Sequence, residues 1–309
     1  MTLLARSAAV SPLALWEQGA CSLEEAYALC IRLARTHYEN FTVGSWLLPR
    51  DKLPHVCALY AFCRTVDDLG DEASGDRLAL LDAWEADLRL CYTGTPRHPY
   101  LKALQATIRA FDIPITPFLK LIEANRLDQR HSRWPTYQDL LFYCDHSANP
   151  VGHLFLYLFG YRDQERQRLA DATCTALQLT NFWQDVRRDW EKGRVYIPME
   201  DMARFGYTEE ELARGVVNDA FRRLMAFEVE RARALFRQGL PLVEKVEGRV
   251  RLDITLFTLG GMSILDAIER QGYDTLTRRP TLSKGRKAWL VVKTFVGMKL
   301  PRAVQGQRR

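Results

Sequence analysis

The sequence predicts a single all-α domain, and three observations support this. Apolar residues recur at helical spacing in segment after segment, and no stretch alternates β-branched with polar residues long enough to form a sheet. No repeat, linker or change of composition marks a domain boundary. With 309 residues, 47% of them hydrophobic, the chain is long enough to bury a substantial core. We therefore expect residues 1–309 to form one helical domain with a basic C-terminal extension over about 278–309.

Capping and turn signals locate the helices of the N-terminal half. Ser22, three residues before Glu25, predicts a capping box that begins a helix reaching about residue 38. Pro54 begins a second helix, which ends in an acidic cluster near residue 70. Further helices are expected at about 76–92, 100–111 and 117–128, because turn residues separate these segments at 93–96 and 113–114.

The C-terminal half continues the same pattern. A helix is expected at about 136–145, followed by a kink or break at 147–152, where Pro150 removes a helix hydrogen bond and Gly152 loosens the backbone. Residues 153–159 are almost wholly apolar and are expected to be buried. The remaining predicted helices cover about 164–189, 208–214, 219–238 and 250–271.

Bulk features restrict the class of protein. No run of about 18 uncharged apolar residues is present, so we expect no transmembrane helix, and residues 1–14 lack the apolar stretch of a signal peptide. The seven cysteines include no Cys-x-x-Cys pair, and most of them lie in apolar helical runs, as small buried thiols do. We therefore expect a cytoplasmic protein in a reducing compartment.

Charge is distributed unevenly. Residues 275–309 contain ten Lys or Arg and no Asp or Glu, whereas the whole chain has a net charge of +5. The rest of the chain is therefore acidic. In the tail, basic residues alternate with Trp289 and Phe295, which suits peripheral binding to the inner face of an anionic membrane. An end helix with a solvated basic face is an equal alternative. We expect no nucleic-acid partner, because no recognition motif is present.

One polar stripe stands out on the helix expected at 164–189. Gln178, Asn181, Asp185 and Asp189 are three or four residues apart, so a helix places them on one face. Two carboxylates and two amides are costly to bury without a cation, and oxygen ligands of this kind suit Mg²⁺. A solvated helix face is the alternative interpretation.

A second acidic cluster ends the helix that begins at Pro54. Asp67, Asp68, Asp71 and Glu72 lie within six residues, and Arg64 precedes them by one turn. Like charges at this spacing destabilise a helix, so a counter-charge is expected. A frayed acidic helix end would explain the cluster equally well. Taken together, however, the two clusters predict a metal site that binds a diphosphate.

An aromatic-rich interior suits a diphosphate ester with a long apolar tail. Loss of the diphosphate would leave a carbocation, which aromatic faces stabilise in a dry pocket. For each candidate aromatic residue, ordinary core packing is the alternative. The candidates are Phe41, Tyr60, Phe62, Phe142, Phe155, Phe159 and Trp183.

The motifs together resemble the squalene/phytoene synthase family. The resemblance covers about residues 34–273 and rests on Arg64-x-x-Asp67-Asp68-x-x-Asp71, Gln178-x-x-Asn181-x-x-x-Asp185-x-x-x-Asp189 and Gly193-Arg194-x-Tyr196-x-Pro198. It implies an isoprenoid-synthase helical fold with a central active-site cavity, and head-to-head chemistry on prenyl diphosphates with Mg²⁺. The implied metal ligands are Asp67, Asp68, Asp71, Asn181, Asp185 and Asp189. The implied catalytic or substrate-binding residues are these aspartates with Arg64, His37, Asn40, Phe41, Gln178, Asn181, Arg194 and Tyr196.

Two departures from the family pattern narrow the expected reaction. Glu39 stands where condensing relatives usually have Lys, and Gln184 stands where they usually have Arg. Both changes remove positive charge, which fits an enzyme that handles one diphosphate. Together with the segment 147–152 they resemble the bacterial hydroxysqualene synthase branch of hopanoid biosynthesis. That branch ionises presqualene diphosphate, opens its cyclopropane and captures water.

Two alternatives to the hydroxysqualene synthase reaction remain open, one with related chemistry and one without catalysis. Condensation of two prenyl diphosphates to presqualene diphosphate, squalene or phytoene is the nearest, and a non-catalytic helical assembly partner is the alternative from another class. A presqualene diphosphate synthase is expected as a partner that supplies the substrate. Lys284 or Arg286 is a further candidate for contacting the diphosphate. We do not expect NADPH, although the absence of Gly-x-Gly-x-x-Gly decides little, because squalene synthases of the family bind NADPH without it.

Overall fold

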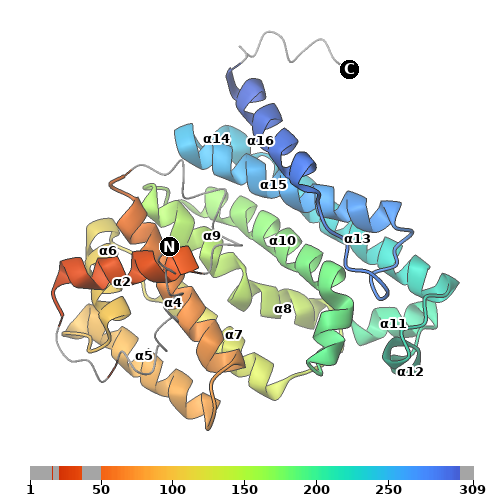
Figure 1. Cartoon of the computed structure of the whole chain (residues 1–309), viewed down its shortest axis with the longest axis horizontal. Coiled ribbons are helices and arrows are strands. Elements are labelled where there is room, and N and C mark those ends of the chain that lie inside the picture. The colour runs from red at the N-terminus through yellow and green to blue at the C-terminus, as the bar shows by residue number, and fades with distance from the viewer. Residues whose placement is uncertain (1–15, 17–20, 37–49, 300–309) are drawn as a thin grey trace, which may run out of the picture. The chain divides into compact units, whose positions relative to one another are not determined.

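The computed structural model describes residues 16, 21–36 and 50–299, and these residues are largely helical (Figure 1). Within these ranges there is no β-strand, and the only bridge is an isolated one between Arg133 and Val195. No helix in the described part of the chain is long and apolar enough to cross a membrane. The described residues group into two compact units, one comprising residues up to 129 with 154–161, and the other comprising 130–153 with 162 onward. The all-α prediction is confirmed, whereas the single domain over 1–309 stays a prediction.

The first unit is built from the helices of the N-terminal half. They are α2 (Leu23–Thr36), α4 (Leu53–Asp71), α5 (Arg77–Thr93), α6 (Pro99–Phe111), α7 (Thr116–Arg130) and the end of α9 (Asn149–Leu158). The predicted capping box is present, because Ser22 and Glu25 each accept a hydrogen bond from the other's backbone N–H, at 3.1 and 2.7 Å. Phe62, Trp84 and Phe118 form the centre of the core and are fully buried.

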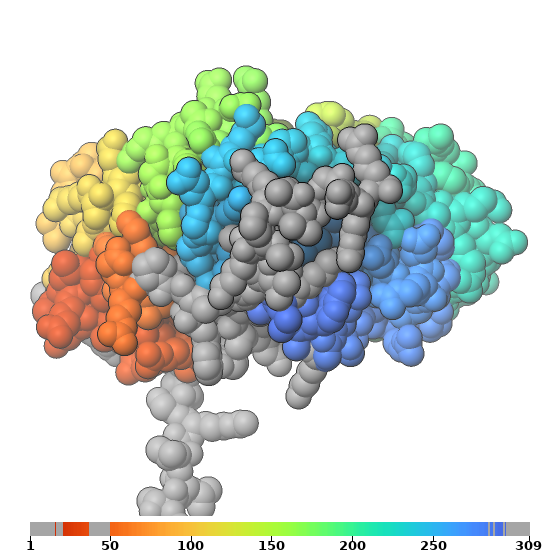
Figure 2. All heavy atoms as spheres, turned by 90° about the horizontal axis from the view of Figure 1, so that it is seen from above, coloured from red at the N-terminus to blue at the C-terminus, as the bar shows by residue number. Residues whose placement is uncertain are grey.

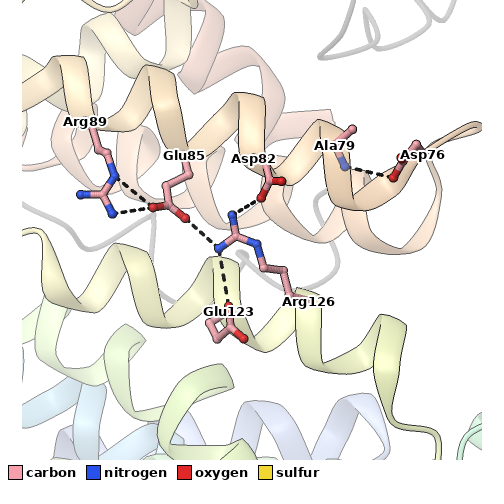
Figure 3. A network of polar contacts seen from close by, with 7 residues as sticks. All are labelled: Asp76, Ala79, Asp82, Glu85, Arg89, Glu123 and Arg126. Carbon is pink, nitrogen blue, oxygen red and sulfur yellow. Dashed lines mark hydrogen bonds and ion pairs between the residues drawn. The ribbon is translucent and has the colours of Figure 1, made fainter.

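An ion-pair network joins α5 and α7 at the surface of this unit (Figure 3). The Arg126 guanidinium lies 2.5 Å from Asp82 Oδ1 and 2.7 Å from Glu85 Oε2, both on α5. Arg126 also lies 3.5 Å from Glu123 on its own helix, and Arg89 binds Glu85 from one turn away. Arg126 is therefore the one cation shared among three carboxylates of two helices.

The second unit contains the longest helix and everything that follows it. Its elements are α8 (Tyr137–Ser147), the start of α9, α10 (Gln164–Glu191), α11 (Met199–Phe205), α12 (Glu209–Ala213), α13 (Asp219–Gly239), α14 (Leu242–Lys245), α15 (Gly248–Arg270) and α16 (Lys284–Lys299). α10 packs against α13 and α15, and α16 packs against α15 (Figure 1). Figure 2 shows the dark blue residues of α16 next to the lighter blue residues that precede them in the chain. α11 and α14 were not predicted, because at 7 and 4 residues they are too short to show a helical period.

The predicted break near Pro150 is confirmed, but the role expected for Gly152 is wrong. α8 ends at Ser147 and α9 begins at Asn149. Gly152 lies inside α9, and a Cβ added there would lie 2.7 Å from Sγ of Cys174 on α10. Glycine at this position therefore permits the close approach of two helices and does not loosen the backbone.

Candidate active site

The first acidic motif lies on the last two turns of α4. Val66 and Leu69 are buried in the core, and this anchors one face of the helix. Asp67 and Asp71, one turn apart, are both exposed to solvent. The helical period thus separates the core-forming residues from a pair of accessible carboxylates, as the sequence predicted.

Arg64 provides the counter-charge that the first motif was expected to need. Its Nη2 lies 2.5 Å from Asp68 Oδ1 and 2.8 Å from Glu72 Oε1. Charge-assisted contacts of this length are among the stronger hydrogen bonds of proteins. Asp68, one of the three aspartates of this motif predicted as metal ligands, thus pairs with a cation of its own helix.

α7 supports the first motif from the side. The Asn125 amide donates to Asp67 Oδ1 at 3.5 Å, and Gln129 donates to the carbonyl of Gly70 at 2.9 Å. A Cβ on Gly70 would lie 2.1 Å from Asn125 Oδ1, so only glycine allows this approach. Surrounding protein atoms raise the pKa of the Asp67 carboxyl to about 7 by desolvation, although the side chain remains accessible to solvent.

Arg77 completes the end of α4. Its Nη2 donates to the carbonyl of Asp71 and its Nε donates to the carbonyl of Ala73, both at 3.0 Å. The last carbonyls of a helix lack partners within it, and a cation there also interacts favourably with the helix dipole. Arg77 therefore stabilises the turn that carries Asp71.

The second acidic motif lies near the end of α10. Gln178, Asn181, Asp185 and Asp189 are all at least partly accessible, while Leu179 and most of the residues between them are buried. The predicted polar stripe is therefore present. The helix departs from regular geometry at Asp185, where φ is −109° and ψ is 15°. This break, which no sequence signal marks, falls at the first of the two carboxylates of the motif.

An arginine far along the chain binds the first carboxylate of this motif. Arg279 Nε lies 2.6 Å from Asp185 Oδ1, and Arg279 Nη2 lies 2.8 Å from Asp185 Oδ2. Arg188, from the same helix as Asp185, approaches to 3.5 Å. The hydrogen bonds to Asp185 are the main cause of the raised pKa of the Arg279 guanidinium. Arg279 was not predicted as a site residue, because 94 residues separate it from Asp185 in the sequence.

Gln184 has a structural partner in the same connecting segment. Its Nε2 donates to the carbonyl of Pro280 at 2.5 Å, and the side chain is buried. From the sequence, Gln184 was interpreted as a lost positive charge beside the metal ligands. The structure adds a cation from elsewhere in the chain, because the connecting segment that Gln184 contacts brings the guanidinium of Arg279 to Asp185.

The Gly193–Pro198 motif packs beside the end of α10. Tyr196 stacks on Phe182 with ring centres 3.8 Å apart and planes 8° apart, so its ring is buried against the helix. Arg194 and Asp189 line one small pocket together with the Phe182 and Tyr196 rings. Tyr196 therefore positions the segment, while Arg194 and Asp189 present polar groups in the same place.

Some predicted residues lie elsewhere. His37, Asn40 and Phe41, together with Glu39, are outside the described residues. Phe62 and Trp183 have no exposed surface, so they pack the core and do not line a cavity. Phe142, at 52% exposure, is the most accessible of the candidate aromatic residues that the structure describes. Tyr60, Phe155 and Phe159 are partly accessible.

The carboxylates of the two motifs suit Mg²⁺ better than they suit a metal whose coordination shell consists only of protein side chains. Among the described residues, no three acidic, histidine or cysteine side chains converge as a cage. Mg²⁺ commonly takes one or two carboxylates and completes its shell with water and phosphate oxygens. The accessible pair Asp67 and Asp71 on α4, and the pair Asp185 and Asp189 on α10, each supply such oxygens. The two pairs lie in different units.

Comparison with known sequences identifies similar enzymes. The profile of the family described as squalene/phytoene synthase matches residues 34–286. The chain is 32% identical to the 15-cis-phytoene synthase of Synechococcus elongatus over 280 residues, which cover 86% of this chain and 91% of the relative. It is 31% identical to phytoene synthase 1 of Zea mays over 273 residues, covering 86% and 67%.

Two solved structures are similar over most of their length. The squalene synthase HpnC from Alicyclobacillus acidocaldarius aligns with a TM-score of 0.80 and 50% identity, covering 82% of this chain and 96% of that one. A dehydrosqualene synthase in complex with a ligand aligns with a TM-score of 0.82 and 26% identity, covering 90% and 98%. The predicted isoprenoid-synthase helical fold is thereby confirmed, whereas its central cavity stays a prediction.

Proposed function

Because the chain belongs to the squalene/phytoene synthase family, whose members act on prenyl diphosphates, we propose that it converts presqualene diphosphate to hydroxysqualene with Mg²⁺. One observation carries this choice within the family. Identity is 50% with the squalene synthase HpnC, but 26% with the dehydrosqualene synthase and 32% with the cyanobacterial phytoene synthase. The resemblance of the sequence to the hydroxysqualene synthase branch of hopanoid biosynthesis points the same way.

The reaction begins with loss of diphosphate. The bond between C1 and the diphosphate oxygen breaks, and its electron pair leaves with the diphosphate. Bound Mg²⁺ would neutralise the developing charge and so improve the leaving group. Asp67, Asp71, Asp185 and Asp189 are the proposed ligands, since their carboxylates are accessible. Opening of the cyclopropane moves the positive charge, water adds to the resulting carbocation, and loss of one proton gives the alcohol.

The remaining site residues orient the substrate. Gln178 and Asn181, which lie on the accessible stripe of α10, are proposed to contact the diphosphate or the water shell of the metal. Arg194 is proposed to bind a diphosphate oxygen beside Asp189, and Tyr196 to hold that segment in place. Arg64 acts through its ion pair with Asp68, the least exposed aspartate of its motif. His37, Asn40 and Phe41 keep their proposed role at the substrate.

A product assay tests the proposal. Purified protein with Mg²⁺ and no NADPH is incubated separately with presqualene diphosphate and with farnesyl diphosphate, and the lipid extracts are analysed by mass spectrometry. Hydroxysqualene from the first substrate, with the second unconsumed, supports the proposal. Consumption of farnesyl diphosphate, or squalene formed only when NADPH is added, contradicts it. Turnover of neither substrate, with intact binding of a presqualene diphosphate synthase, would instead identify a non-catalytic assembly partner.

Head-to-head condensation of two prenyl diphosphates is the second candidate, and two observations favour it. The curated relatives at 31–33% identity are named phytoene synthases. In addition, Arg279 supplies a cation beside Asp185, which weakens the argument that this chain has too little positive charge for two diphosphates. The farnesyl diphosphate arm of the assay, repeated with geranylgeranyl diphosphate, decides between the two reactions.

Peripheral binding to an anionic membrane, on the cytoplasmic face, is proposed for α16. Trp289 and Val292 are 46% and 60% exposed, whereas Leu290 is buried, so the helix turns one apolar face outward and another inward. The Arg286 guanidinium lies 4.6 Å from the centre of the Trp289 ring. Trp289→Ser should reduce co-sedimentation with vesicles containing phosphatidylglycerol, and unchanged sedimentation would contradict the proposal.

A further inference from the structure

The connection between α15 and α16 (residues 271–283) is held in a defined conformation. Asp274 Oδ1 accepts hydrogen bonds from the backbone N–H groups of Leu276 and Thr277, at 3.2 and 3.0 Å. Gln271 Nε2 donates to the carbonyl of Arg278 at 2.6 Å. These bonds form the turn after which Arg279 reaches α10.

Two adjacent residues of this connection contact two adjacent residues of α10. Gln184 binds the carbonyl of Pro280, and Asp185 binds the guanidinium of Arg279 through both carboxylate oxygens. The first contact is buried and neutral. The second is partly accessible, since Arg279 and Asp185 are 35% and 21% exposed. The ion pair is therefore reachable from solvent, whereas the amide contact is not.

A divalent cation and Arg279 compete for the same carboxylate. Both oxygens of Asp185 already accept a hydrogen bond from the guanidinium, and a metal bound to either oxygen would lie close to that positive charge. Arginine cannot lose its proton in this environment, so the repulsion is relieved only by movement of the side chain. Arg279 lies on a connection between helices and not within one, which makes such movement feasible.

We infer that Arg279 is an exchangeable counter-ion of Asp185, which neutralises this carboxylate until a divalent cation displaces it. Displacement loosens the connection between α15 and α16. The backbone of residues 271–283 therefore becomes more mobile when a metal binds at the second motif. The inference rests on the proposed function in one respect, because it requires Asp185 to be a metal ligand. It does not depend on which prenyl diphosphate the enzyme uses.

Metal affinity tests the exchange directly. Binding of Mn²⁺ alone to the full-length protein is measured from the electron paramagnetic resonance signal of the free ion. Removing a competing charge-assisted bond should make Arg279→Gln bind the metal roughly tenfold more tightly than the wild type. Arg278→Gln is the matched control, because it removes the same charge from the neighbouring residue, which bonds to Gln271 and not to Asp185. Equal affinities of the two variants would overturn the inference.

A second measurement needs no variant of Arg279. Hydrogen–deuterium exchange of peptides covering 271–283 should become faster when Mn²⁺ is added to the wild type. Unchanged or slower exchange would overturn the inference. Asp185→Asn should abolish both the faster exchange of residues 271–283 and the tightest Mn²⁺ binding. Persistence of both would overturn the inference, because the metal would then bind elsewhere. These readouts stand apart from the product assay, so a failure of the proposed reaction leaves them interpretable.

Discussion

The two acidic motifs obtain their counter-charges in different ways. On α4, Arg64 lies one turn before Asp68 and pairs with it, so the cation comes from the same helix. On α10, the bidentate partner of Asp185 is Arg279, which arrives from the connection after α15. The first arrangement follows from helical spacing, whereas the second requires the whole second unit to be folded. Similar sequence patterns can thus conceal a local and a long-range electrostatic environment.

The immediate backbone also differs between the motifs. Asp67 and Asp71 lie on a regular helix whose end is stabilised by Arg77 and by Gln129 from α7. Asp185 lies where α10 departs from helical geometry. Active-site residues are often found in this sparsely populated region of backbone conformation. The second motif is therefore the one in which a change of partner at Asp185 is most easily accommodated.

Neutralising either motif should have the largest effect. We expect Asp67→Asn and Asp185→Asn each to lower kcat by about 10³-fold or more, because both carboxylates are proposed to hold the metal that stabilises the leaving diphosphate. Steady-state turnover of presqualene diphosphate measures this, with circular dichroism as the control for folding. A tenfold loss or less in one variant would mean that its motif is dispensable, and would break the proposed equivalence of the two.

Buried acids provide a second contrast between the units. In the first unit, buried Asp87 accepts hydrogen bonds from two backbone N–H groups and from Trp16. In the second, Glu228 is fully buried beside Asp201, and the only cation that bonds to either of them in the described contacts is Arg231. Desolvation is the main cause that raises the pKa of Glu228 to about 9.

This contrast predicts how stability depends on pH. Between about pH 4.5 and 9 the folded state keeps the proton on Glu228 and the unfolded state does not, so stability should fall as pH rises. The loss attributable to Glu228 should approach about 1.4 kcal/mol per pH unit. Urea unfolding at pH 6 and pH 8 measures it. Glu228→Gln should flatten the dependence, and an identical slope in the variant would show that other groups cause it.

Close packing beside the first motif should produce a smaller effect. Gly70→Ala places a methyl group against the Asn125 amide, so we expect a loss of about 1–3 kcal/mol in the free energy of unfolding. In an Asn125→Ala background the same change should cost less than about 1 kcal/mol, because the amide is absent and only the Cβ at position 125, at 3.1 Å, remains close to the new methyl group. A double-mutant cycle by urea denaturation measures the coupling. Additive effects would show that the two side chains do not meet.

The surface network between α5 and α7 should contribute least. Arg126→Met removes the cation shared by Asp82 and Glu85, and we expect a loss of about 1 kcal/mol in stability, because such pairs are partly solvated. Turnover at saturating substrate should stay within about twofold of the wild type, since none of these residues belongs to the proposed site. Thermal unfolding and the product assay measure both. A large loss of activity would link this network to the first motif.

The sequence by itself determined most of the longer helices, the helix on which each motif lies, and the family. These features depend on periods of three and four residues, on caps such as Ser22, and on motifs contained within one helix. The sequence could also place Arg64 beside Asp68, because one helical turn separates them. It had no means of testing the roles expected for His37, Asn40 and Phe41, which lie outside the described residues.

Only the tertiary structure decided which groups meet across long separations. Arg279 binds Asp185, and Gln184 donates to the carbonyl of Pro280, because the connection after α15 packs against α10. Gly152 lies close to the thiol of Cys174 because α9 packs against α10. Phe62 and Trp183 are likewise buried in the core and not at a cavity, because neighbouring helices cover them completely. Local spacing governs which face a side chain occupies, whereas its partner depends on the packing of distant segments, and no short sequence pattern encodes that.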